Sequence, residues 1–232
     1  MARILWDLAG ADATRRFSPY CWRIRLALRH KGLEFEAKPW HFTDKQAIAF
    51  SGQGKVPVLQ DGDMVINDSW AIAEYLDHAY PDHPSVLGQG ALLGVNRFAT
   101  DWVDQTVQPL MFPMLVADIH AHVDDADKDY FRATREKVLG RSLEEARAGR
   151  DAVRPQFDKA LTPLRKTLAR QPFMGGDAPT WADIAAFGAF QWARSISAYA
   201  LLEPSDPVWS WRERMLDAYD GEGRKTQAYE QA

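Results

Sequence analysis

The chain has 232 residues, 46% of them hydrophobic, and its 28 basic and 32 acidic residues give a net charge of -4 at neutral pH. This length is enough for one large domain or two smaller ones, whereas the slightly acidic balance excludes the broad basic surface that nucleic-acid binding requires. Cys21 is the only cysteine, which excludes an intramolecular disulfide, and no run approaches the roughly 20 apolar residues of a membrane span, so we expect a cytoplasmic protein.

The first part of the chain has the pattern of a small α/β domain. Residues 3–8 predict a short strand, and the polar stretch after them predicts a loop. A helix is predicted from Pro19 to about Lys31, because proline fits the first turn of a helix and Gly32 is a C-terminal stop signal. Residues 33–39 alternate in polarity and predict a second strand.

Two more strands and a helix complete this first part. The apolar runs 56–59 and 64–66 flank a tight Asp-Gly-Asp turn, which predicts a β-hairpin. A helix is then predicted from Asp68 to about Ala79. The order β-α-β, loop, β-β-α, with a proline at the start of the third strand, is the thioredoxin arrangement.

The rest of the chain is predicted to be helical almost throughout. Proline and glycine interrupt residues 81–91, which we interpret as a linker between domains. Beyond it, Phe157 begins an apolar stripe with helical spacing, and Thr180 begins a helix with an aspartate in the capping-box position. The sequence therefore predicts an α/β thioredoxin-like domain at residues 1–80 and an all-α helical domain at residues 92–232.

Ser18 stands where a thiol-redox turn would carry its first cysteine. In a Cys-Pro-x-Cys turn, the helix N-terminus lowers the pKa of that cysteine, but residues 18–21 read Ser-Pro-Tyr-Cys. A serine does not ionise there, although its hydroxyl can hydrogen-bond the thiolate of another molecule. Such a bond contributes about 1.5 to 3 kcal/mol, close to the roughly 2.7 kcal/mol that lowers a thiol pKa by about two units. The alternative is that Ser18 only caps the helix.

Four motifs in this order resemble the glutathione transferase superfamily. They are Ser-Pro-Tyr-Cys-Trp-Arg from Ser18, Lys-Val-Pro-Val-Leu from Lys55, Asp-Ser-Trp-Ala-Ile-Ala-Glu-Tyr-Leu from Asp68 and Gly-Gly-Asp-Ala-Pro-Thr-Trp-Ala-Asp from Gly175. Shorter phrases such as Ser-Pro-Tyr-x-Trp-Arg and Tyr-Pro-Asp resemble the bacterial lignin β-etherase branch, whose members use glutathione to cleave β-aryl ethers. The resemblance implies a homodimeric detoxification enzyme with glutathione as co-substrate and an apolar, aromatic electrophile.

The resemblance also assigns roles to residues in the first domain. Ser18 is the catalytic candidate, because its hydroxyl would donate a hydrogen bond to the glutathione sulfur. The bond between Val56 and Pro57 is expected to be cis, so that the Val56 backbone pairs with the extended tripeptide. Lys55 would face the glycyl carboxylate, although a solvated lysine at the edge of the sheet is the alternative.

Asp68, Ser69 and His41 complete the expected glutathione site. Asp68 would hold the γ-glutamyl amine, and Ser69 would hold the γ-glutamyl carboxylate at a helix start that offers free N–H groups. Simple N-capping is the alternative role for the Asp68–Ser69 pair, and one residue can serve both purposes. His41 lies where related enzymes often place a basic residue.

The electrophile is expected to bind between the loop at Phe17 and the first helices of the second domain. Met111, Phe112 and Met114 are candidate wall residues, because a mobile apolar surface that contains methionine suits aromatic substrates. The same residues could be plain core. Trp40 and Trp192 are further candidates for this pocket.

Two other functions stay open at this point, and no metal is expected. Cys21 could support a glutathione-dependent peroxidase or thiol transferase, or it could be a small packed hydrophobe. A non-catalytic adaptor that keeps the fold is the other alternative. Residues 125–136 imitate a calcium loop, but Tyr130 stands where that loop needs glycine for its sharp turn.

Overall fold

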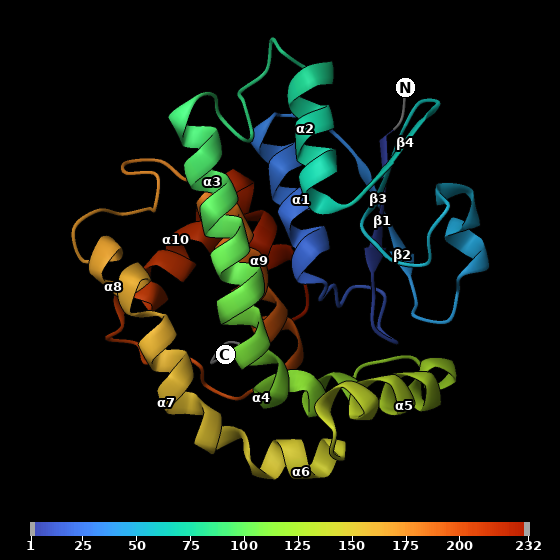
Figure 1. The fold of residues 1–232 in the computed structure, drawn as a ribbon. Coiled ribbons are helices and arrows are strands. Elements are labelled where there is room, and N and C mark those ends of the chain that lie inside the picture. The colour runs from blue at the N-terminus through green and yellow to red at the C-terminus, as the bar shows by residue number, and fades with distance from the viewer. Residues whose placement is uncertain (1–2, 230–232) are drawn as a thin grey trace.

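A four-stranded sheet forms one side of the computed structural model, which describes residues 3–229 (Figure 1). The strand order is β2-β1-β3-β4, in which β1 pairs with β2 in parallel and with β3 antiparallel, and β3 and β4 form the predicted hairpin. The strands are β1 (Arg3–Leu8), β2 (Glu36–Trp40), β3 (Val58–Asp61) and β4 (Met64–Asn67).

Two helices connect the sheet to the helical part of the chain. Helices α1 (Pro19–His30) and α2 (Ser69–Ala79) lie between the strands and most of the remaining helices (Figure 1). A short 3-10 helix, Gln46–Ser51, lies in the connection from β2 to β3. The predicted thioredoxin-like α/β domain is confirmed.

The remaining helices form the predicted all-α part, so both halves of the fold prediction are confirmed. A π-helical turn follows directly after α3, and α4 continues from it. The elements are α3 (Ala91–Trp102), the π-turn (Val103–Val107), α4 (Gln108–His120), α5 (Lys128–Leu139), α6 (Leu143–Ala148), α7 (Arg150–Ala160), α8 (Thr162–Leu168), α9 (Trp181–Ile196) and α10 (Pro207–Gly221), with short 3-10 turns at Asp125–Asp127 and Glu222–Lys225.

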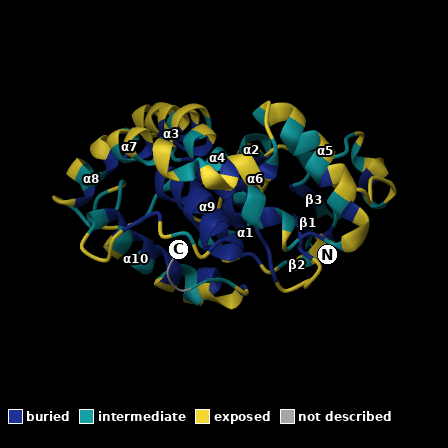
Figure 2. Cartoon of the chain, turned by 90° about the horizontal axis from the view of Figure 1, so that it is seen from below, coloured by how far each residue is buried: buried dark blue, intermediate teal, exposed yellow. Residues whose placement is uncertain are grey.

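Helix α9 is the centre of the molecule. All 16 of its residues are buried, and Figure 2 shows it enclosed by the other elements. A helix that is buried on every side must be apolar or small on every side, and Ala, Phe, Trp, Ile and Gly make up most of this one. Neither α9 nor any other helix between residues 3 and 229 is long and apolar enough to cross a lipid bilayer.

Helix α1 packs closely against α9, and a glycine makes this approach possible. A Cβ atom on Gly188 would lie 2.4 Å from the backbone oxygen of Pro19, so no residue with a side chain fits there without displacing a backbone. The first turn of α1 is therefore held directly against the centre of the helical part.

The second strand begins three residues later than the alternation predicts. Gly32 has a φ of 68°, in the left-handed region, and the N–H of Leu33 donates to the carbonyl of Leu28 at 2.9 Å. Leu33 is thus used to close the end of α1. Only from Glu36 can the chain pair with β1.

The apolar stripe that starts at Phe157 crosses two helices and not one. Helix α7 ends at Ala160 and α8 begins at Thr162, with Pro163 in its first turn. All four side chains of the stripe are nevertheless buried, namely Phe157, Leu161, Leu164 and Leu168. The spacing of the apolar residues correctly identified the buried face, but it did not predict the break between α7 and α8.

Candidate active site

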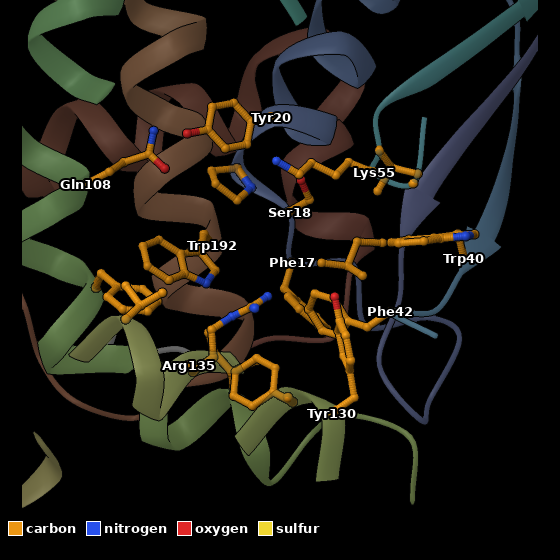
Figure 3. A pocket seen from close by; sticks show the side chains of 18 of the residues that line it. Phe17, Ser18, Tyr20, Trp40, Phe42, Lys55, Gln108, Tyr130, Arg135 and Trp192 are labelled. Atoms are coloured by element: carbon orange, nitrogen blue, oxygen red, sulfur yellow. The ribbon is translucent and has the colours of Figure 1, made fainter. Parts of the chain in front are cut away.

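A cavity of about 820 Å³ lies between the sheet and the helical part, at the start of α1 (Figure 3). Elements from both halves line it: the first turn of α1, the loops after β2 and before β3, and residues of α4, α5 and α9. The lining is largely aromatic, with Phe17, Tyr20, Trp40, Phe42, Phe112, Tyr130, Phe131 and Trp192. An apolar cavity with a few convergent polar groups is the usual form of a small-molecule site.

Ser18 is the N-cap of α1 and lies in the wall of this cavity. Its hydroxyl oxygen accepts a hydrogen bond from the backbone N–H of Cys21 at 3.2 Å, and only 4% of the residue is exposed. A hydroxyl that accepts one hydrogen bond keeps its own O–H group to donate. The capping role is therefore compatible with donation to an atom bound in the cavity.

Cys21 is fully buried behind this turn and does not line the cavity. Its Sγ lies 3.9 Å from the backbone oxygen of Trp6. Burial, together with the nearby negative charge of Asp7, raises the pKa of the Cys21 thiol well above its usual range. A thiol that is both buried and protonated is a poor nucleophile, so the geometry argues against redox chemistry at this residue.

The loop before β3 contributes Lys55 and Val56 to the opposite wall. The peptide bond between Val56 and Pro57 is cis, as expected, and Pro57 is buried beneath the loop. Lys55 is exposed at this edge (Figure 3).

Asp68 and Ser69 lie at the start of α2, and neither is among the residues that line the cavity. The Asp68 carboxylate caps the helix by accepting from the N–H groups of Trp70 at 2.9 Å and Ala71 at 3.1 Å. Asp68 has a φ of 71°, an uncommon conformation for a residue with a side chain. Such a conformation costs stability and is enriched at functional sites, which makes this helix start a candidate binding point.

Three other predicted residues do not line the cavity. Met111 and Met114 on α4 are buried in the core, whereas Phe112 on the same helix does line the cavity. His41 is half-buried after β2, and its Nδ1 is buried with no hydrogen-bond partner among the described residues. Trp40 and Trp192, which the sequence offered as further candidates, both line the cavity (Figure 3).

The sequence analysis missed a polar group built on the π-helical turn. The Arg23 guanidinium, almost fully buried, forms a two-point ion pair with Asp104, and Gln108 Nε2 donates to Asp104 Oδ1 at 2.6 Å. Tyr20 stacks beneath Arg23, with 4.8 Å from the guanidinium carbon to the ring centroid. Such π-turns are frequent at functional sites. The spacing of Asp104 and Gln108 on one helix face was visible in the sequence, but nothing signalled their contact with α1.

Burial, followed by the negative charge of Asp104, raises the pKa of the Tyr20 phenol. The phenol therefore keeps its proton at neutral pH and is a hydrogen-bond donor in the cavity wall (Figure 3). The start of α1 therefore places two hydroxyl groups in the cavity wall: that of Ser18 at the N-cap and that of Tyr20 in the first turn.

Three cationic side chains also line the cavity: Lys45, Lys55 and Arg135. Burial lowers the pKa of Lys45 and of Arg135. The sequence analysis did not single out Lys45 or Arg135, because neither belongs to a motif. Within residues 3–229, no three His, Cys, Asp or Glu side chains are grouped so as to hold a metal ion.

Comparisons with known proteins match both halves of the chain to the same family. Residues 17–79 match the family described as "Glutathione S-transferase, N-terminal domain", and residues 95–204 match "Glutathione S-transferase, C-terminal domain". Glutathione S-transferase Z2 of Arabidopsis thaliana is 40% identical over 92 residues, which are 38% of this chain and 41% of that protein. Four such plant relatives are matched over only 41% to 44% of their length.

Two solved structures are similar over nearly the whole chain. The glutathione transferase GSTFuA3 from Phanerochaete chrysosporium has a TM-score of 0.76 at 25% identity and covers 97% of this chain and 94% of its own. The glutathione S-transferase CsGST63524 of Ceriporiopsis subvermispora, solved in complex with glutathione, has a TM-score of 0.74 at 23% identity, with 96% and 93% covered. The second is similar in fold alone.

Proposed function

Because this chain belongs to the glutathione S-transferase superfamily, we propose that it is a glutathione transferase in which Ser18 stabilises the thiolate of bound glutathione. The observation that carries the proposal is the position of the Ser18 hydroxyl, at the N-terminus of α1 and in the wall of the cavity between the sheet and the helical part. Free N–H groups and the helix dipole favour a negative charge at this point. The solved complex of a structural neighbour supports glutathione as the ligand.

The tripeptide is proposed to extend from Ser18 along the edge of the sheet. Val56, held before Pro57, would pair with its backbone, and Lys55 would face its glycyl carboxylate. The start of α2, with Asp68 and Ser69, would hold the γ-glutamyl end, for which the unusual φ of Asp68 is the supporting observation.

His41 is proposed as an additional contact to glutathione. Its buried Nδ1 has no hydrogen-bond partner within the described part of the chain, and a ligand would supply one.

The electrophile is proposed to be aromatic and to bind between Phe17 and Phe112, with Met111 and Met114 packed behind that wall. A β-aryl ether is the first candidate. In that reaction the thiolate forms a C–S bond at the β-carbon, the C–O bond breaks, and the phenoxide leaves and takes up a proton. The aromatic lining of the cavity supports a substrate with aromatic rings on both sides of the broken bond.

The function is tested by incubating the protein with glutathione and a panel of electrophiles: β-aryl ethers, chloronitrobenzenes, isothiocyanates and hydroperoxides. We expect glutathione conjugates from at least one aromatic electrophile, with release of a phenol if an ether is cleaved. Mass spectrometry identifies the conjugates. A protein that is not retained on immobilised glutathione and forms no conjugate would instead be an adaptor.

We also propose that the protein is a cytoplasmic homodimer. An apolar strip on α3 is open to solvent in the single chain, with Phe98 74% exposed and Val95 59% exposed beside Leu92. Single chains rarely expose such contiguous apolar side chains, and a second copy would cover them.

The substitution Phe98→Glu is expected to convert the dimer to a monomer, because a carboxylate would be buried without a partner in the interface. Light scattering coupled to size exclusion measures the mass, expected at twice 26.3 kDa for the unaltered protein. The control is Val138→Glu on α5, since Val138 is equally exposed at 72% and lies elsewhere. Equal masses for the unaltered protein and the Phe98 variant would contradict this role of α3.

A further inference from the structure

Arg135 on α5 points into the cavity and has no acidic partner within residues 3–229. Figure 3 shows its guanidinium directed toward the space below Ser18 and between the aromatic side chains. Its one hydrogen bond within residues 3–229 runs from Nη1 to the hydroxyl of Thr134 at 2.9 Å. Among the ion pairs of residues 3–229, none includes Arg135. A half-buried cation without a counterion costs stability, so such a group calls for a functional explanation.

The arginine one turn earlier on the same helix shows the contrast. Arg132 does not line the cavity and forms ion pairs with Glu136 at 2.8 Å and with Glu144 at 2.9 Å. Of these two arginines on α5, Arg132 is paired with two carboxylates, whereas Arg135, which lines the cavity, is paired with none among residues 3–229.

Aromatic rings hold the Arg135 guanidinium in place. Its central carbon lies 5.2 Å from the centroid of Phe42 and 4.9 Å from that of Phe131. Cation–π contacts of this kind fix the group without using its N–H donors. Although burial lowers the pKa of Arg135, an arginine remains charged at neutral pH. The N–H donors that do not bind Thr134 are therefore available to a molecule in the cavity.

The cavity wall as a whole favours an anion. Of its ionisable side chains, Asp104 is the only carboxylate, and that carboxylate is already bound by Arg23 and Gln108. Lys45 donates to the backbone oxygen of Gly54 at 2.6 Å, and its Nζ also lies 5.6 Å from the ring centroid of Tyr130 on α5. The proposed glutathione site uses Lys55, and Lys45 already donates to Gly54, so Arg135 is left for the second substrate.

We propose that Arg135 binds the carboxylate of an acidic aromatic electrophile, so that the preferred substrates are aromatic acids. The planar guanidinium suits a carboxylate because it offers two parallel N–H donors, and the neighbouring Phe42, Phe131 and Trp192 suit the ring. This inference rests on the proposed transferase function for its second substrate. It names a substrate class and the residue that selects it.

The kinetic test uses para-chloro-meta-nitrobenzoate and its methyl ester with glutathione. In both, the thiolate forms a C–S bond at the ring, the C–Cl bond breaks and chloride leaves, while the thiol proton goes to solvent. Arg135→Gln is expected to lower kcat/KM for the acid by roughly 10- to 100-fold, the factor of one hydrogen bond to a charged group, and to leave the ester nearly unchanged. Arg135→Lys, which keeps the charge, should recover part of the loss.

The matched control is Arg132→Gln, which removes an arginine from the same helix outside the cavity. It is expected to leave the ratio of acid to ester unchanged. If Arg135→Gln lowers the rates for acid and ester equally, or lowers neither, the inference is overturned, whereas the transferase function stands because conjugates still form.

A binding measurement separates the two proposals. Calorimetric titration with the same acid and ester, without glutathione, reports affinity and does not require turnover. Tighter binding of the acid that is lost in Arg135→Gln supports the inference even if no conjugate ever forms. Equal affinity of the unaltered protein for acid and ester overturns it.

Discussion

Replacement of Ser18 by alanine is expected to raise the pKa of bound glutathione by about two units, back toward the ~8.5 of a free thiol. In the proposed mechanism the Ser18 hydroxyl at the start of α1 stabilises the thiolate, and alanine offers no donor. At a pH near ~6.5 the thiolate fraction would fall by roughly 50-fold, and turnover would fall with it. Above pH ~8.5 the thiolate fractions of the two proteins should become equal, because glutathione is then ionised in both. Thiolate absorbance of the complex, titrated against pH, measures this directly.

Two controls separate this role from capping and from thiol chemistry. Ser18→Gly also lacks the hydroxyl but costs a helix N-terminus only a few tenths of a kcal/mol, so it should match the alanine variant in pKa and exceed it in stability. Cys21→Ala should leave the titration unchanged, since that thiol is buried behind the cavity. An unchanged thiolate pKa in both Ser18 variants would rule out the mechanism.

Loss of the Asp183 carboxylate is expected to destabilise the fold by about 3 to 5 kcal/mol, because several buried N–H donors lose their acceptor and each such group costs about 1 to 3 kcal/mol. Asp183 is fully buried at the start of α9. It accepts from the N–H groups of Met174 at 2.7 Å, Gly175 at 3.1 Å and Thr180 at 2.9 Å, and from Trp211 Nε1 at 2.9 Å. Asp183→Ala would leave these donors without an acceptor.

Denaturant unfolding followed by circular dichroism measures that loss. Asp183→Asn keeps one accepting oxygen but turns an amide toward N–H donors, so an intermediate loss is expected. The control is Asp177→Ala in the same loop, which is exposed and should change stability by less than about 0.5 kcal/mol. Equal stability of the Asp183 and Asp177 alanine variants would show that the carboxylate is dispensable.

Most of the fold was predictable because its signals are local. The strand at β1, the proline at the start of α1, the turn between β3 and β4 and the capping box of α9 each lie within a few residues. The predicted start of β2 was wrong because Leu33 is used to end α1: its N–H donates to the carbonyl of Leu28, and this contact overrides the alternating pattern.

The cavity was only partly predictable for the same reason. Ser18 and Val56 belong to motifs and line it, as does Phe17 directly before the first motif, whereas Arg135 belongs to none and is brought there by the packing of α5. On α4 the sequence cannot tell which side faces the cavity. A step of one residue turns a helix by about 100°, so Phe112 lines the cavity while Met111 is in the core.

The glycine at position 188 makes the two parts of the chain difficult to recombine with those of relatives. Its missing side chain lets the helical part touch the backbone at Pro19, one residue from Ser18. A hybrid whose helical part came from a protein with a bulkier residue at that point would push the first turn of α1 outward. Because Ser18 caps that turn, its hydroxyl would move away from the position proposed for the glutathione thiolate. The hybrid would lose this contact even though every motif of the first part was intact.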